Sequence, residues 1–76
     1  MHFQLSVFYQ GSLFLYAITT DDKKTFHFQL KSAPPGKKAP EVFTVLHPQK
    51  DVWNFDQNWD KEFQDGVITV MKRTKL

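Results

Sequence analysis

Apolar and polar residues alternate through the first part of the chain, and one glycine interrupts the alternation. Strict alternation is typical of a β-strand with one buried face, because successive side chains of a strand point to opposite sides. Gln10-Gly11 stands between the two alternating runs. Glycine readily adopts the positive φ that a two-residue hairpin loop requires. The pattern therefore predicts a β-hairpin with strands over residues 2–9 and 12–20.

The register of this hairpin follows from the position of the turn. Three cross-strand pairs on one face are entirely apolar or aromatic: Val7 with Phe14, Leu5 with Tyr16, and Phe3 with Ile18. The opposite face is mixed, with polar residues at its open end and an apolar patch near the turn that consists of Phe8, Leu13 and Leu15. A slip by one residue would exchange the two faces, so the first face is predicted to form the core.

The next alternating run, 25–31, predicts a third strand. Its apolar side matches the hairpin if Ile18 pairs with Phe26 and Tyr16 with Phe28. This pairing leaves a three-residue loop at 21–23, which is an acceptable hairpin length.

Residues 32–40 contain three prolines and a glycine, which favours an exposed loop. Beyond this loop the pattern predicts strands over 41–47 and 52–55. We expect Trp53 to lie opposite Val45 and Phe55 opposite Phe43.

The last third of the chain allows two interpretations. The favoured one is a helix over 57–73 with Asp56 as its N-cap, because one apolar stripe continues from Trp59 to Met71. The alternative is a short helix over 57–65 that ends at Gly66, followed by a sixth strand over 67–72. Glycine inside a helix costs about 1 kcal/mol relative to alanine. However, the segment after it does not alternate as a half-buried strand would.

These elements predict an α+β fold: one domain over residues 1–76, with a five-stranded antiparallel meander and a C-terminal helix packed on one face. Aromatic residues make up 16% of the chain and supply the bulk for a compact core. There are no cysteines, so neither disulfides nor thiolate zinc sites are available.

Charge and hydropathy restrict the function classes only weakly. The formal net charge is +2, which is slight evidence for a polyanionic partner. No apolar run is long enough to cross a membrane, and the N-terminal residues lack the features of a signal peptide. We therefore expect a cytoplasmic protein.

No group of residues in the sequence indicates catalysis. The three histidines, His2, His27 and His47, lack the spacing of metal ligands. The carboxylates at 56, 60, 62 and 65 suit the start of a helix better than an acid–base pair. We accordingly expect a non-enzymatic protein with no metal ion and no cofactor.

The leading hypothesis for function is a small interaction module that acts through a protein partner or as a homodimer. Its candidate interface consists of Phe8, Leu13, Leu15 and Leu46. The alternative is a module that binds single-stranded nucleic acid through sheet aromatics and loop lysines. Its candidate contacts are Lys23, Lys24, Lys37 and Lys38.

Overall fold

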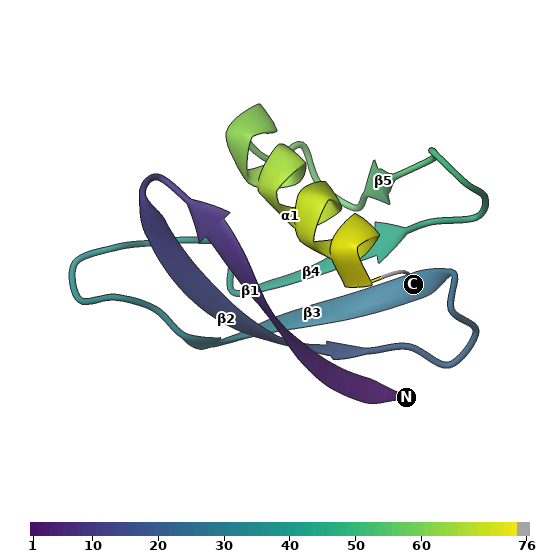
Figure 1. The fold of residues 1–76 in the computed structure, drawn as a ribbon, viewed down its shortest axis with the longest axis horizontal. Coiled ribbons are helices and arrows are strands. Elements are labelled where there is room, and N and C mark those ends of the chain that lie inside the picture. Colours follow the sequence, from purple (N-terminus) through teal and green to yellow (C-terminus); the bar gives the residue numbers. More distant parts are fainter. Residues whose placement is uncertain (75–76) are drawn as a thin grey trace.

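Each strand of the sheet pairs antiparallel with the strand before it in the chain, and a single helix follows the last strand (Figure 1). The structure is a computed structural model and describes residues 1–74. Its elements are β1 (His2–Tyr9), β2 (Ser12–Thr19), β3 (Thr25–Ser32), β4 (Val42–Leu46), β5 (Asn54–Phe55) and α1 (Lys61–Thr74). The predicted α+β meander with a C-terminal helix is confirmed.

The β1–β2 hairpin has the predicted turn and the predicted register. Val7 pairs with Phe14, and Tyr9 with Ser12 across the turn. Gln10 and Gly11 have φ values of 50° and 74°, as expected for a type I′ turn. The right-handed twist of this turn matches that of the two strands, so it fixes which residues face each other.

The register between β2 and β3 differs from the prediction by two residues. Ile18 pairs with Phe28 rather than with Phe26, and Tyr16 pairs with Leu30. The loop is longer because Asp22 Oδ1 accepts hydrogen bonds from the backbone N–H groups of Lys24 and Thr25, both at 2.8 Å. A shift by two residues leaves every side chain on its expected face.

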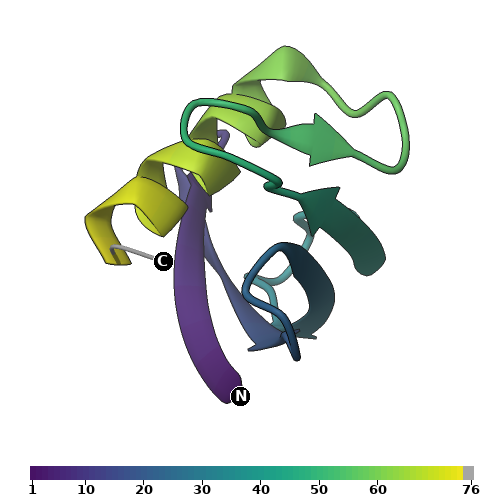
Figure 2. The ribbon, with the colours of Figure 1, turned by 90° about the vertical axis from the view of Figure 1, so that its right-hand side faces the viewer.

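The sheet curls strongly, and α1 closes the open side of the curl (Figure 2). Leu15 pairs with Ser32 while Tyr16 pairs with Leu30, which leaves Lys31 as an extra residue in β3. Such a bulge bends the strand that contains it and increases the local twist. The curl therefore turns the inner face of the sheet toward the helix.

The fifth strand is shorter than predicted, and its pairing is also different. Phe55, not Trp53, lies opposite Val45. Asp51 has a φ of 66°, and the N–H of Val52 donates to Gln49 O at 3.1 Å, so a turn occupies this stretch. Trp53 consequently lies outside the sheet.

The helix begins at Lys61, four residues later than predicted, and its N-cap is Asp60 rather than Asp56. Asp60 Oδ1 accepts a hydrogen bond from the N–H of Glu62 at 3.3 Å. Asp56 instead continues the strand pairing, because its N–H donates to Thr44 O at 3.0 Å. The alternative with a sixth strand is wrong, since residues 67–72 are helical.

Gly66 is required where α1 crosses β1. A Cβ atom at this position would lie 2.6 Å from the backbone oxygen of Phe8 and 3.4 Å from a methyl group of Val7. No real Cβ approaches a carbonyl oxygen so closely. The glycine that lowers helix propensity is therefore the residue that permits close packing of the helix on the sheet.

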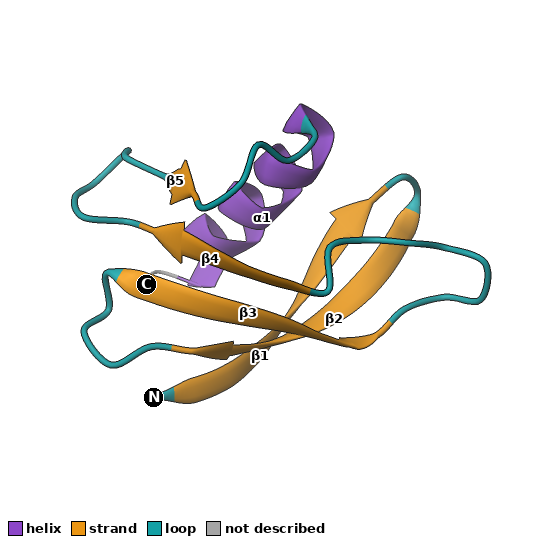
Figure 3. Ribbon diagram, turned by 180° about the vertical axis from the view of Figure 1, so that it is seen from behind, coloured by secondary structure: helices purple, strands orange, loops and turns teal. Residues whose placement is uncertain are grey.

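The core is a cluster of aromatic rings between the inner face of the sheet and α1. Phe43 stacks on Phe28 with ring centroids 4.6 Å apart, and it meets Tyr16 and Phe63 edge-on at 5.4 and 5.3 Å. The helix contributes three fully buried side chains: Phe63, Val67 and Met71. Viewed from behind, β4 crosses in front of the lower end of this helix, and the loop between β3 and β4 crosses in front of β1 and β2 (Figure 3).

Candidate binding site

The outer face of the hairpin carries two large apolar side chains that nothing covers. Phe8 and Leu13 are directly opposite each other, and they are 62% and 59% exposed. Leu15 lies beside them and is half-buried. Three of the four residues of the predicted interface thus form one patch, which we call the hairpin patch: Phe8, Leu13 and Leu15.

Leu46, the fourth predicted interface residue, lies elsewhere. It is 46% exposed and pairs with Thr25 at the far end of β3. Phe8 and Leu13 adjoin the β1–β2 turn, at the other end of the sheet (Figure 1). The structure therefore does not bring Leu46 to the hairpin patch.

A groove of about 480 Å³ separates the hairpin patch from α1. We call it the outer groove. Its floor is made by Ser6, Phe8 and Leu13, and its helical wall consists of Glu62, Asp65, Gly66, Thr69, Val70 and Arg73. The close approach at Gly66 sets the distance between wall and floor.

The free edge of β1 adjoins the outer groove. Thr20 N–H donates to Met1 O at 3.0 Å, which shows that odd-numbered residues of this strand bond to β2. Backbone groups of even-numbered residues therefore point away from β2, because hydrogen-bonded and non-bonded pairs alternate in an antiparallel ladder. At Phe8 this edge is covered by the helix. At His2, Gln4 and Ser6, all of them exposed, it presents a row of N–H and C=O groups.

Charges are distributed unevenly along the outer groove. Glu62 and Asp65 lie at the end near the turn, whereas Arg73 lies near the opposite end. Glu62 also accepts a hydrogen bond from the N–H of Gln10 at 3.0 Å, which ties the hairpin turn to the first turn of α1. The groove is thus acidic at one end and basic at the other.

The four lysines of the nucleic-acid hypothesis form two separate pairs. Lys23 and Lys24 lie in the β2–β3 loop, and Lys37 and Lys38 lie in the β3–β4 loop. These loops are at opposite ends of β3, along the longest dimension of the molecule (Figure 1). They do not combine into one basic surface.

The histidines each have a nearby polar partner or ring. The Nδ1 atoms of His2 and His27 lie 3.3 and 3.2 Å from the hydroxyl oxygens of Thr19 and Thr44. His47 stacks on Trp53 with ring centroids 3.7 Å apart. Within residues 1–74, no three His, Asp or Glu side chains are grouped so that they could hold a metal ion.

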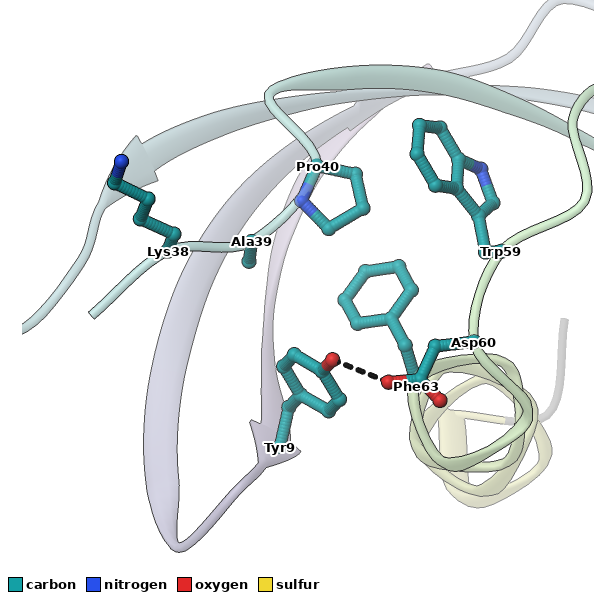
Figure 4. A pocket seen from close by; sticks show the side chains of 7 residues that line it. All are labelled: Tyr9, Lys38, Ala39, Pro40, Trp59, Asp60 and Phe63. Atoms are coloured by element: carbon teal, nitrogen blue, oxygen red, sulfur yellow. Dashed lines mark hydrogen bonds between the residues drawn. The ribbon is translucent and has the colours of Figure 1, made fainter.

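A second concave site lies on the other side of the helix N-terminus (Figure 4). We call it the inner pocket. It has a volume of about 340 Å³ and is lined by Tyr9, Lys38, Ala39, Pro40, Trp59, Asp60 and Phe63. Three separate segments build it: the end of β1, the loop before β4, and the start of α1.

A short hydrogen bond fixes the polar part of the inner pocket. The hydroxyl of Tyr9 donates to Asp60 Oδ2 at 2.5 Å. This bond, together with burial and the negative charges of Asp60 and Glu62, raises the pKa of Tyr9 from 10.0 to about 12. Tyr9 therefore stays neutral over the physiological range and keeps donating to the carboxylate.

The loop wall of the inner pocket is anchored from the core. Tyr16 is fully buried, and its hydroxyl donates to Pro40 O at 2.6 Å. Burial raises the pKa of Tyr16 above its ordinary value. This bond holds Ala39 and Pro40 at the entrance of the pocket.

Sequence reasoning did not find the inner pocket. Its key pair, Tyr9 and Asp60, is separated by 51 positions. An N-cap at Asp60 would have placed this carboxylate at the start of the helix, but its position beside Tyr9 depends on how α1 crosses the sheet. The N-cap was predicted at Asp56 instead.

Comparison of the chain with protein families, with curated proteins and with solved structures finds no match. Within the part of the chain that the structure describes, no helix is both long and apolar enough to cross a membrane. We therefore infer function from the geometry of the outer groove and the inner pocket.

Proposed function

We propose that this chain is a small, non-enzymatic protein-interaction module that binds an extended segment of a partner protein in the outer groove. The segment adds to the free edge of β1 as a further strand. The observation that carries this proposal is the pair of exposed apolar side chains, Phe8 and Leu13, next to the part of the β1 edge that remains open at Gln4 and Ser6. A cytoplasmic location, expected from the sequence, belongs to the same proposal.

Strand addition would use both kinds of group in the groove: the apolar side chains and the free backbone N–H and C=O groups of the strand edge. The edge groups of Gln4 and Ser6 supply main-chain hydrogen bonds, which give affinity with little dependence on sequence. Side chains of an added strand alternate, so every second one would lie on the outer face beside the hairpin patch and be selected as apolar. Exposed long edges favour aggregation, and the helix limits this one by covering the edge at Phe8.

The charges along the outer groove suggest which segment fits. A basic residue of the partner would lie near Glu62 and Asp65, and an acidic group near Arg73. This complementarity favours a peptide with separated charges over a uniformly basic or acidic one.

The test uses a displayed library of random eight-residue peptides, selected against the purified protein and measured by fluorescence polarisation. We expect enrichment of alternating apolar sequences with a basic residue near one end. Phe8→Ser should weaken the selected peptides roughly tenfold or more, which corresponds to about 1.4 kcal/mol.

Gln4→Pro tests the backbone contribution separately. Proline removes the Gln4 N–H, which points to the free edge, and edge strands tolerate proline at such positions. Peptide binding should fall while thermal unfolding changes little. If Gln4→Pro binds peptides as well as the unchanged protein does, strand addition at this edge is wrong.

Sedimentation of the free protein tests the competing occupant. A monomer that binds peptides supports the proposal. A stable dimer that Phe8→Ser dissociates would show that a second copy fills the groove, and would overturn the proposed partner.

A further inference from the structure

The inner pocket lies on the face opposite the outer groove, and nothing in the proposed peptide binding uses it. It is lined mainly by carbon. Tyr9 and Phe63 form its floor with ring centroids 5.2 Å apart in an edge-on arrangement. Trp59 and Pro40 stand on either side of the opening (Figure 4). Its volume of about 340 Å³ lies within the range for sites of small ligands.

The pocket has few polar groups, and its lining contains one charged residue of each sign, Asp60 and Lys38. Asp60 is the only carboxylate among its lining residues. Lys38 contributes its stem to the rim, but Figure 4 shows its ammonium group directed away from Tyr9 and Trp59. The ring nitrogen of Trp59 lies on the side of the indole away from Pro40, and the six-membered ring lies on the side toward Pro40 (Figure 4). Aromatic rings beside a carboxylate form an environment that attracts cations.

The lining of the pocket restricts the kind of cation. Asp60 Oδ2 accepts from the hydroxyl of Tyr9 at 2.5 Å, and Oδ1 accepts from the N–H of Glu62 at 3.3 Å. Each oxygen can accept a further hydrogen bond, but the rest of the lining is mostly carbon. A primary ammonium or a guanidinium has about 3 or 5 N–H donors, and only some of them could reach Asp60. A cation without N–H donors needs no such partners and is attracted by the carboxylate and the ring faces.

We propose that the inner pocket binds a trimethylammonium group, held by the faces of Tyr9 and Trp59 and by the charge of Asp60. The same chemistry occurs on a free small molecule such as choline and on a trimethylated lysine of a protein. Either source would place the methyl groups against the rings and the positive charge near the carboxylate.

The first experiment is an NMR titration of the full chain with choline and, separately, with its uncharged isostere, in which carbon replaces the nitrogen. We expect choline to shift the indole N–H of Trp59 and the amide of Ala39 in a saturable way. Its affinity should exceed that of the isostere by about tenfold, the effect of a cation–π and charge contribution of roughly 1.4 kcal/mol. Equal binding of the two, or no saturable shift, would overturn the proposal.

Two variants with the same change of charge separate a local effect from a general one. Asp60→Asn keeps an oxygen that can accept from Tyr9 but removes the charge in the pocket. Asp65→Asn removes the same charge from the outer groove. We expect Asp60→Asn to weaken choline about tenfold and Asp65→Asn to leave its affinity unchanged. Equal weakening by both variants would mean that only the net charge of the protein matters, which contradicts the proposed site.

Because Asp60 is also the N-cap of α1, Asp60→Asn could change the start of the helix as well as the charge of the pocket. Trp59→Leu is a second variant that avoids this problem. It leaves Asp60 and its hydrogen bonds in place and removes one ring face. Choline affinity should fall severalfold while the Ala39 amide still reports any remaining binding. Unchanged affinity would exclude the ring from the site.

The source of the group is distinguished by short peptides that contain one trimethylated lysine, titrated beside choline and beside the same peptides unmethylated. Tighter binding of the methylated peptides than of choline assigns the pocket to a modified protein. Tighter binding of choline assigns it to a small molecule. Preference for the unmethylated peptides would overturn the inference. None of these results depends on Phe8, so failure here leaves the peptide groove untouched.

Discussion

Neighbouring residues of the hairpin illustrate two different uses of large apolar side chains. Val7 and Phe14 are fully buried on the inner face, whereas Phe8 and Leu13, each one position away, are 62% and 59% exposed on the outer face. The backbone and the strands are the same for both pairs. Only the inner pair gains the free energy of burial, about 25 cal/mol per Å² of apolar surface removed from water.

This contrast indicates that the two faces are under different constraints. The inner face is filled by a continuous aromatic cluster centred on Phe43. Phe8 and Leu13 are mostly exposed, so burial in the core does not account for them. The proposed peptide binding would account for them, and substitutions that separate stability from binding test the contrast directly.

The largest expected effect is at the centre of the inner face. Phe43→Ala removes a ring that packs on Tyr16, Phe28 and Phe63, and should cost about 3–5 kcal/mol of unfolding free energy. Phe8→Ala should change stability by no more than about 0.5 kcal/mol. Urea denaturation measures both.

In a chain of this size Phe43→Ala can unfold the protein outright, and Phe43→Leu then gives the measurable, smaller loss. The contrast between the faces fails if Phe8→Ala costs as much as Phe43→Leu. In that case the hairpin patch would belong to the core.

The second effect lies where α1 separates the two faces. Gly66→Ala gains about 1 kcal/mol of helix propensity but places a Cβ against the carbonyl oxygen of Phe8. Because backbone must move, we expect a net loss of about 1–3 kcal/mol. Thr69→Ala, on the exposed side of the same helix, serves as the control and should not destabilise. A more stable Gly66→Ala protein would show that the close approach does not limit packing.

The sequence predicted the faces of the fold more reliably than its registers. The alternation of apolar and polar residues identified β1 to β4 and the inner face, because a strand with one buried face carries an apolar residue at every second position. The shift of two residues between β2 and β3 was invisible to the same signal, since Phe26 and Phe28 both remain on the inner face. The hydrogen bonds of Asp22, which lengthen the loop, decided the register.

The region 47–60 was predicted least well, for a related reason. Trp53 and Trp59 are large and apolar, which suggested a strand and a helix position, yet both lie outside regular elements. Trp53 stacks on His47, and Trp59 forms a wall of the inner pocket. In so short a segment the alternation covers too few residues to predict the structure. Local residues decide it instead, such as Asp51 in the turn and Asp60 at the N-cap.

The same limit applies to the candidate sites. Phe8, Leu13 and Leu15 could be predicted to lie together because they belong to one hairpin. The helical wall of the outer groove and the Tyr9–Asp60 pair depend on how α1 crosses the sheet. No local pattern in the sequence encodes that crossing apart from Gly66, whose role becomes clear only from its distance to Phe8.

The smallest effect concerns Tyr9, at the edge of the inner face. Tyr9→Phe removes the hydrogen bond to Asp60 and should cost about 1 kcal/mol near neutral pH.

The pKa of Tyr9 is raised from 10.0 to about 12, so the folded state favours the neutral phenol. This contribution is complete below pH 10.0 and is lost as the pH rises through about 12. The unfolding free energy of the unchanged protein should therefore fall more steeply over that interval than that of Tyr9→Phe. Tyr16 is present in both proteins and cancels in the difference. Parallel pH profiles, measured by urea denaturation, would mean that the bond to Asp60 does not couple the protonation of Tyr9 to folding. In that case the stabilising contacts of the inner face would end at Phe14 and Phe63 and would not include the hydrogen bond in the pocket.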